Sequence, residues 1–465
     1  MTRRIALFWA VLCLAAAPVK AQRPAARRVI LVLIDSLRAD RLGCYGYSKP
    51  TSPHIDRLAG ESAVFEAAVA QAPWTLPSVA SLMTSLYPER HGVSFSSSHS
   101  AVGLPPADRT LAESFSEAGF ETAAFVSPGF LSPRFGLGRG FKNYMVDPIA
   151  SWSRSLHSAR AWLESQGQGR AFLLLHTNDV HSPFHPPHTF VRRFDPGYEG
   201  VLDQLWLDDY FLRALNRLER GQGLAAAPEA YVRLVEQVRA SERDLDHLRA
   251  HYDGSVAYAD ELLGAFLDQL KESGSWENTV LALISDHGEE LGERGRFYHG
   301  LSLHEELVRI PWIMKGPGIA ARRIAEPVEE IDVAPTLLEL AGLEPPAGFQ
   351  GRSLAGALKG DQPIPARAAL SSRTDTRSRR VLEASVRSGA WKLILDPATG
   401  KKRLYDLSAD PGERRDLAAR HPGRLEQLLF ERETRLGRNR GQKPVSRADL
   451  GQEEIKALRE LGYLK

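Results

Sequence analysis

The sequence predicts an α/β fold in which a mixed, mostly parallel sheet lies between helices and a small C-terminal α+β subdomain follows. Short apolar runs recur along the chain with helical stretches between them, which is the element order of such a sheet. The composition, 43% hydrophobic and 25% charged over 465 residues, suits a globular protein of more than one folded unit. It excludes a multi-span membrane protein, a collagen and a coiled coil.

The apolar runs have the length and continuity of strands that are buried on both faces. The predicted strands are 29–34, 120–126, 171–176, 279–285 and 309–315, and the helices between them include 54–65, 109–118 and 151–165. Ligands of open α/β sheets bind beyond the carboxyl ends of the strands. Polar residues that fall at such ends are Asp35, His176, Asp179, His181, Asp286 and His287.

The later part of the chain departs from this alternation. Residues 196–245 read as an aromatic, amphipathic insertion, either a lid over the site or an additional packing helix, and 228–273 as a long helical stretch. A helix is expected at 332–341, two strands at 391–394 and 404–407, and a helix at 422–436. The expected division is a signal peptide at 1–21, a catalytic domain at 28–345, a linker at 346–365, a C-terminal subdomain at 366–436 and a tail at 437–465.

The first residues have the pattern of an export signal. Arg3 and Arg4 precede an apolar run at 5–17, and small residues follow around Ala21. We therefore expect a periplasmic or secreted protein with no stable membrane span after signal cleavage; an uncleaved anchor is the alternative. Removal of 1–21 leaves Cys44 as the only cysteine, so no internal disulfide is expected.

Positive charge concentrates toward the C-terminus. Residues 366–443 contain 19 Lys and Arg residues against 10 Asp and Glu residues. An Arg-rich solvated face is the simpler interpretation, and attraction to an anionic polymer or a membrane surface is the alternative. No nucleic-acid-binding motif accompanies these charges, so no nucleic-acid partner is expected.

Two strand-end segments and the start of a predicted helix combine into a candidate metal centre. Asp35 supplies a hard oxygen ligand, and Asp286 and His287 add a carboxylate and an imidazole. Thr75 stands where an N-cap would, with Pro77 in the first turn, so its hydroxyl would lie at the positive end of a helix. A simple capping threonine is the alternative. This oxygen and nitrogen set suits one divalent ion, either Mn²⁺, Ca²⁺, Zn²⁺ or Mg²⁺, beside a hydroxyl nucleophile.

Histidines near the predicted strand ends are candidates for contact with an anionic substrate. His176, His181 and His185 fall within ten residues, and His299 follows Asp286 by 13 residues. Imidazoles can donate to anionic oxygens or protonate a leaving group. A structural hydrogen-bonding role is the alternative for His176 and His185.

The chain resembles the sulfatase-like branch of the alkaline phosphatase superfamily, from about Arg28 to near Leu407. The motifs that carry the resemblance are VLIDSLRADRLGCYGY, WTLPSVASLMTSLYPERHGV, HTNDVHSPFHPP, ISDHGEELGERGRFYHG, HEELVRIPWIMKGPG, WKLI and LYDLSADPGE. The resemblance implies an alkaline-phosphatase-like fold and a metal held by Asp35, Asp286, His287 and Thr75. It further implies that Thr75 is the nucleophile and that His181 and His299 contact the anionic group of the substrate, with His176 as a further contact.

The nucleophile motif departs from the family pattern. Typical sulfatases have Cys or Ser, any residue, Pro, Ser and Arg, and the first residue is oxidised to formylglycine. Here the stretch runs from Thr75 to Val79 as TLPSV, and a secondary alcohol cannot give an aldehyde, so no formylglycine is expected. A Thr sulfate ester would have to be cleaved by water, which favours phosphoryl or phosphonyl transfer through a covalent Thr75 intermediate.

Other departures concern charge. Ser36 replaces a second aspartate, His287 stands where many sulfatases have Asn, and His299 stands where several relatives have Lys. Fewer cations favour a singly charged diester or phosphonate monoester over a doubly charged monoester. An arginine from the 196–245 insertion or from the basic C-terminal unit could restore the charge.

These observations predict an exported, metal-dependent, sulfatase-like hydrolase that cleaves phosphate, phosphonate or sulfate esters. The substrate would be an anionic ester of a glycan, a lipid headgroup or a small molecule. The alternatives are a sulfuric ester hydrolase with an unusual nucleophile and a non-catalytic binder of anionic glycans. A lipid-headgroup transferase is less favoured, because such enzymes are normally tethered by several helices.

Overall fold

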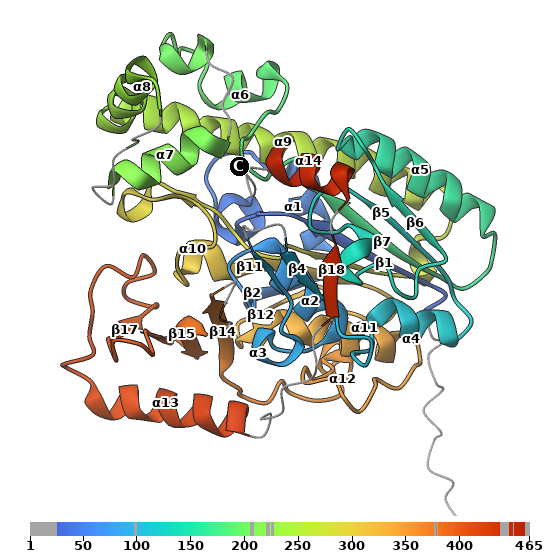
Figure 1. Ribbon diagram of the computed structural model, residues 1–465. Helices are drawn as coiled ribbons and strands as arrows, with labels where there is room; N and C mark the ends of the chain where they lie inside the picture. Colours follow the sequence, from blue (N-terminus) through green and yellow to red (C-terminus); the bar gives the residue numbers. More distant parts are fainter. Residues whose placement is uncertain are drawn as a thin grey trace, which may run out of the picture.

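The computed structural model describes residues 26–96, 100–204, 209–219, 224, 227–375, 378, 380–437, 446–449 and 451–460. Strand β1 (Arg28–Ile34) lies inside the main sheet and is buried along its whole length (Figure 1). It pairs in parallel with β7 (Ala171–Thr177) on one side and β8 (Thr279–Ile284) on the other. Both neighbours are also fully buried, because their continuous apolar sequences leave no polar face for solvent.

The main sheet has nine strands in the order β12-β2-β11-β8-β1-β7-β5-β6, with β13 paired to β2. Strand β11 (Arg309–Lys315) runs antiparallel to β8 and β2, while the other pairs are parallel. The predicted mixed, mostly parallel sheet is therefore confirmed. Its remaining strands are β2 (Ala63–Val69), β5 (Glu121–Val126), β6 (Asn143–Val146), β12 (Arg322–Ile324) and β13 (Val328–Glu329).

Helices cover both faces of this sheet. Alternate residues of β1 enter two different hydrophobic clusters, with Leu31 in one and Ile30 in the other. The cluster around Leu31 includes residues of α2 (Thr75–Thr84), α4 (Leu111–Glu117) and α11 (Val333–Leu340). The cluster around Ile30 includes residues of α1 (Pro53–Gly60), α5 (Trp152–Ser165) and α9 (Glu242–Glu272).

The helical insertion follows β7. It contains α6 (His188–Phe194), α7 (Asp209–Glu219) and α8 (Glu229–Ala240) before the long helix α9 (Figure 1). The stretch predicted as one helix over 228–273 is two helices, because the chain leaves the helical conformation at Ser241. The Ser241 hydroxyl caps α9 by accepting the backbone N–H of Asp244 at 3.2 Å.

A second, antiparallel sheet of four strands follows the main sheet in sequence, in the order β14-β15-β16-β17. Its strands are β14 (Ala369–Thr374), β15 (Val381–Ser388), β16 (Trp391–Leu395) and β17 (Lys402–Asp406), and α13 (Pro422–Gly437) packs against it. Sequence patterning found only the last two strands, since β14 and β15 contain many Ser and Arg residues. The buried Lys392 ammonium joins the sheet to α10 (Glu305–Val308), 2.9 Å from the Glu305 carboxylate.

Two further predictions need correction. Residues 54–65 do not form one helix, because α1 ends at Gly60 and Ala63 already belongs to β2, where an apolar run packs between β11 and β12. The tail contains β18 (Ser446–Asp449), which pairs with β4 (Ser100–Gly103), and α14 (Gln452–Glu460). The other short elements are α3 (Pro88–His91), β3 (Ser94–Ser96), β9 (Glu290–Leu291), β10 (Phe297–Tyr298) and α12 (Ala355–Leu358).

None of the helices in the described part of the chain has the length and apolar character needed to cross a bilayer. The predicted signal peptide at 1–21 lies outside the described residues.

Candidate active site

Asp35 directly follows β1 and is held by the strand ends around it. Its N–H donates to the Thr177 carbonyl oxygen at 3.0 Å, which continues the pairing of β1 with β7. The chain then turns at Ser36, whose φ of +59° is uncommon for a residue with a side chain. The Ser36 hydroxyl donates to Asp35 Oδ1 at 2.9 Å, and its N–H donates to Asp286 Oδ1 at 3.2 Å. These bonds bring two carboxylates from different strands together.

Asp286 and His287 lie in the turn after β8. His287 Nδ1 is 2.8 Å from the Gly288 carbonyl oxygen and must carry a proton to bond to it, which leaves Nε2 facing the carboxylates. Nε2 lies 3.5 Å from both Asp35 Oδ1 and Asp286 Oδ2. Only glycine fits at position 288, since a Cβ there would lie 2.0 Å from the Glu306 carbonyl oxygen.

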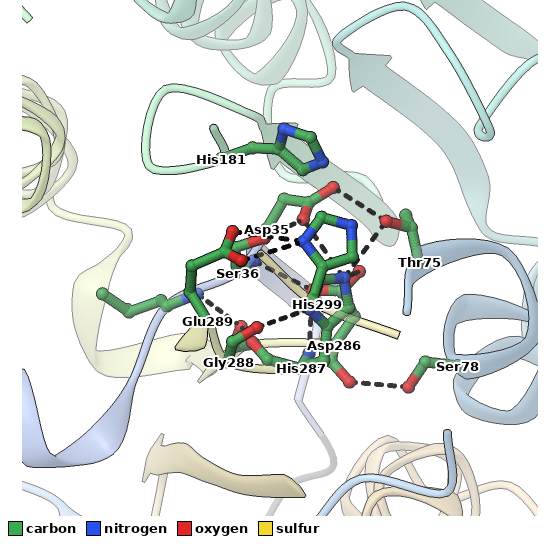
Figure 2. A network of polar contacts seen from close by, with 12 residues as sticks. Asp35, Ser36, Thr75, Ser78, His181, Asp286, His287, Gly288, Glu289 and His299 are labelled. Carbon is green, nitrogen blue, oxygen red and sulfur yellow. Dashed lines mark hydrogen bonds and ion pairs between the residues drawn. The ribbon is translucent and has the colours of Figure 1, made fainter. Parts of the chain in front are cut away.

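Thr75 is the first residue of α2 and not its N-cap, which is Trp74. Its hydroxyl therefore does not cap the helix. Thr75 Oγ1 instead lies 3.2 Å from His287 Nε2 and 3.4 Å from Asp35 Oδ2, as Figure 2 shows. The buried threonine hydroxyl thus faces the Asp35 carboxylate and the His287 imidazole.

Ser78, one turn further along α2, ties this helix to the Asp286 turn. Its Oγ lies 2.6 Å from the Asp286 carbonyl oxygen and 2.7 Å from Glu330 Oε2. Burial raises the pKa of Glu330 well above its usual value. The Ser78 hydroxyl thus links the Asp286 turn to the buried Glu330 carboxyl.

The residues Asp35, Asp286 and His287 fit a divalent metal ion. One potential ligand atom from each lies within 4.8 Å of the others, and all three residues are buried. Asp286 Oδ2 is buried with no hydrogen-bond partner among the described residues, which is costly unless a ligand binds it. Two carboxylates and one imidazole suit Mg²⁺, Mn²⁺, Ca²⁺ or Zn²⁺.

The pKa values of the two carboxyl groups are shifted in opposite directions. Burial raises the pKa of Asp286 well above its usual value, and the neighbouring Asp35 charge raises it further. Burial also disfavours ionisation of Asp35, but the imidazoles of His176, His181 and His287 nearby lower its pKa. A divalent cation would allow both carboxylates to ionise.

The four predicted histidines occupy different places. His181 and His299 lie together, with ring centroids 4.8 Å apart, and His299 is 4.5 Å from the His287 ring. His176 lies in β7 with Nε2 3.6 Å from Asp35 Oδ2, so it contacts a candidate metal ligand. His185 is exposed in the loop before α6. Asp179 lies outside the three-residue metal group, and burial raises its pKa to about 7.

Glu289 contributes to the site although sequence reasoning did not assign it a role. Its carboxylate lies 3.1 Å from His299 Nδ1, and both side chains are buried (Figure 2). This contact places a proton on Nδ1 and fixes the orientation of the ring. The available sequence signal was the position of Glu289 within the same SDHGE turn as Asp286 and His287.

Val79 occupies the position where typical sulfatases have an arginine. Its side chain is buried in the same hydrophobic cluster as Leu31. Helix α2 therefore presents no guanidinium at this position, and any compensating cation must come from another element.

The fold and the site together define an ester hydrolase of the alkaline phosphatase superfamily. A sequence profile of the sulfatase family matches residues 27–343, and a profile of the C-terminal part of N-sulphoglucosamine sulphohydrolase matches residues 292–436. The chain belongs to the sulfatase family, whose members bind a divalent metal ion.

Relatives of the chain include both sulfatases and phosphonate hydrolases. A Delta 4,5-hexuronate-2-O-sulfatase of Bacteroides thetaiotaomicron is 24% identical over 424 residues, which cover 84% of each chain. The solved structure of a phosphonate monoester hydrolase of Agrobacterium radiobacter superposes with a TM-score of 0.68 at 22% identity, covering 89% of this chain and 96% of that chain. A 2-O GAG sulfatase superposes with a TM-score of 0.70 at 21% identity, covering 91% and 95%. At these identities the two structures establish the shared fold.

Proposed function

We propose that the protein is an exported, metal-dependent hydrolase that cleaves phosphate, phosphonate or sulfate esters through a covalent intermediate on Thr75. The observation that carries this proposal is the position of Thr75 Oγ1, between Asp35 Oδ2 at 3.4 Å and His287 Nε2 at 3.2 Å. A buried threonine hydroxyl at the first turn of a helix, beside a candidate metal site, has the surroundings of an activated nucleophile.

The metal ligands in this proposal are Asp35, Asp286, His287 and Thr75. A bound divalent ion supplies positive charge that favours the ionised form of a neighbouring hydroxyl and withdraws charge from the ester oxygens. Thr75 Oγ1, after losing its proton to water, forms a bond to the phosphorus or sulfur atom while the bond to the leaving oxygen breaks. Water then cleaves the Thr75 ester, which returns a proton to Oγ1 and releases the inorganic acid, the phosphonic acid or, from a phosphodiester, a phosphate monoester.

His181 and His299 are proposed to contact the anionic group and, in the doubly protonated form that a bound anion favours, to protonate the leaving oxygen from Nε2. Without an anion, burial lowers the pKa of His299 well below its usual value. The contact of Nδ1 with Glu289 orients the His299 ring, so that Nε2 remains for the substrate. His181 is oriented in the same manner, because its Nδ1 lies 2.5 Å from the Ser182 carbonyl oxygen. His176 is the third proposed contact, and its Nε2 lies 3.6 Å from Asp35 Oδ2.

The substrate class follows from the nucleophile and the charge around it. Formylglycine hydrate can expel sulfate by collapsing to the aldehyde, whereas Thr75 offers no such route. Val79 removes a cation from the nucleophile helix, and His299 replaces a lysine. We therefore expect phosphodiesters or phosphonate monoesters to be cleaved faster than aryl sulfates.

A panel of matched 4-nitrophenyl esters tests this proposal. The kcat/KM values for the sulfate, phosphate monoester, phosphodiester and phosphonate monoester are measured with Mn²⁺, Ca²⁺, Zn²⁺ and Mg²⁺ in turn. A diester or phosphonate is expected to exceed the sulfate by about tenfold or more. A tenfold advantage for the sulfate would instead identify a sulfuric ester hydrolase with an unusual nucleophile. Failure to hydrolyse any of the four esters would identify a binder of anionic glycans.

A further inference from the structure

A cavity of about 530 Å³ borders the candidate active site, and His299 lines it. Its volume lies within the range of small-molecule binding sites, roughly 300 to 1,000 Å³. The rest of the lining comes from elements that are far apart in the sequence, namely α7, the segment around β10 and the end of β14. Trp74, which immediately precedes Thr75, also lines it, so the cavity extends from the proposed reaction centre.

The lining has an excess of positive charge. Arg213 and Arg217 come from α7 and Arg373 comes from β14, whereas Asp375 is the carboxylate that lines the same cavity. A concave surface with this charge concentrates anions. We call Arg213, Arg217 and Arg373 the pocket wall.

Arg213 of the pocket wall is linked to His299 by a stack of side chains. Arg213 Nη2 donates to the Tyr298 hydroxyl at 2.8 Å, and its guanidinium carbon lies 4.7 Å from the Tyr298 ring centroid. The Tyr298 ring in turn stacks on His299, with centroids 4.0 Å apart. This contact orients the guanidinium of Arg213. Tyr298 has a φ of +79°, an unfavourable backbone conformation for a bulky residue, of the kind that clusters at ligand sites.

Helix α7 is attached to β10 at the same place. The Asn216 side-chain carbonyl accepts the Phe297 N–H at 2.7 Å, and its amide donates to the Phe297 carbonyl oxygen. Asn216 is buried and lies between the two arginines of α7 in sequence. This pair of hydrogen bonds fixes the position of both arginines relative to His299, two residues after Phe297.

We propose that the pocket wall binds a second oxyanion, a carboxylate or a sulfate, on the leaving part of the ester. The preferred substrate is then an ester that carries at least two negative charges on a ring-sized scaffold. Trp74 and Phe95 supply apolar lining for such a ring, while the arginines supply donors that match oxyanion geometry. The proposal rests on the proposed function for the place of the reacting group, and it names the specificity of that same site.

The binding of two non-hydrolysable probes to the metal-loaded full chain tests the proposal. Naphthalene-2-sulfonate and naphthalene-2,6-disulfonate differ only in the second oxyanion, and isothermal titration calorimetry gives a Kd for each. We expect the disulfonate to bind about tenfold tighter or better to the unaltered chain. Arg213→Gln and Arg373→Gln should each reduce the ratio of the monosulfonate Kd to the disulfonate Kd several-fold. The double variant should bring this ratio close to one.

The control variant is Arg233→Gln on α8, whose arginine pairs with Glu229 at the surface and does not line the cavity. It should keep the ratio of the unaltered chain, whereas Asp375→Asn should increase it. Unchanged affinity for the monosulfonate and an unchanged circular dichroism spectrum show that each variant is folded. The proposal is wrong if the unaltered chain binds the two sulfonates equally well. It is also wrong if Arg213→Gln and Arg373→Gln keep the same ratio of the two Kd values as the unaltered chain. If the unaltered chain shows no ester turnover but still binds the disulfonate more tightly than the monosulfonate, only the proposed function is contradicted.

Discussion

The two sides of the candidate site are built in different ways. On one side, Asp35, Asp286 and His287 lie just after β1 and β8, two strands of the main sheet that pair with each other in parallel. On the other side, the pocket wall is assembled from two separate elements. Arg213 comes from α7 in the helical insertion, and Arg373 comes from β14 in the second sheet. The first arrangement is specified by the fold of the sheet, and the second depends on how later elements dock. The strand-end side is therefore expected to govern the reaction, and the pocket wall to govern substrate selection.

Metal removal should have the largest effect, because it disables the strand-end side as a whole. Treatment with a chelator is expected to abolish ester turnover and to lower the melting temperature, since a ligand at 100 times its Kd contributes about 2.7 kcal/mol to stability. Addition of Mn²⁺ or Ca²⁺ should restore both. Nitrophenyl ester assays and thermal unfolding check this, with Asp286→Asn as the matched variant. Full turnover after chelation would contradict the metal assignment.

Substitution of the nucleophile should have the next largest effect. Thr75→Ala is expected to lower kcat by about 10³-fold or more, because no other hydroxyl takes over the attack, while Thr75→Ser keeps part of the activity. Thr84→Ala is the control, since Thr84 lies at the other end of α2 and its hydroxyl bonds to the Ala80 carbonyl oxygen. Near-normal turnover by Thr75→Ala would assign the nucleophile elsewhere.

Loss of the α7 attachment should have a smaller, selective effect. Asn216→Ala removes both hydrogen bonds to Phe297, so the arginines of α7 lose their fixed position. The Kd of naphthalene-2,6-disulfonate is expected to rise about tenfold, while turnover of a simple nitrophenyl ester changes only a few-fold. Asn143→Ala, at an exposed position of β6, is the control. Equal losses for the two readouts would mean that α7 supports the reaction centre itself.

The smallest effect at neutral pH is expected for His91. His91 Nδ1 accepts the Val93 N–H at 3.0 Å, and burial lowers the pKa of His91 to about 3. The unfolded chain, with a histidine pKa near 6.5, binds this proton more readily. Stability is therefore fully present above about pH 6.5 and falls as the pH drops toward 3, by at most about 1.4 kcal/mol per pH unit.

His91→Asn tests this dependence, since its side-chain oxygen can accept the same N–H without titrating. Urea unfolding of both proteins at pH 7.5, 6 and 4.5 measures the difference. The unaltered chain should lose more stability between pH 6 and 4.5 than the variant does. Parallel pH profiles would show that His91 does not contribute to acid sensitivity.

Local patterns predicted much of the main sheet and of the strand-end side. A run such as RVILVLI can be buried on both faces only in a covered parallel sheet, and the polar residue after it must then lie at the ligand-binding edge. The first three residues of β2 were assigned to a helix, because a short apolar run of small residues fits both periodicities. Strands β14 and β15 were missed, since their polar residues gain burial only through pairing within the second sheet.

The sequence by itself determined the sheet, its covering helices and a family of ester hydrolases, because apolar periodicity and short motifs act over a few residues. It also indicated that a threonine stands at the nucleophile position without the usual arginine. The tertiary structure decided that Thr75 begins α2, that Glu289 contacts His299, and that arginines from α7 and β14 line one cavity. These relations join residues across turns and separate elements, so they depend on how packed helices and sheets dock and not on local sequence.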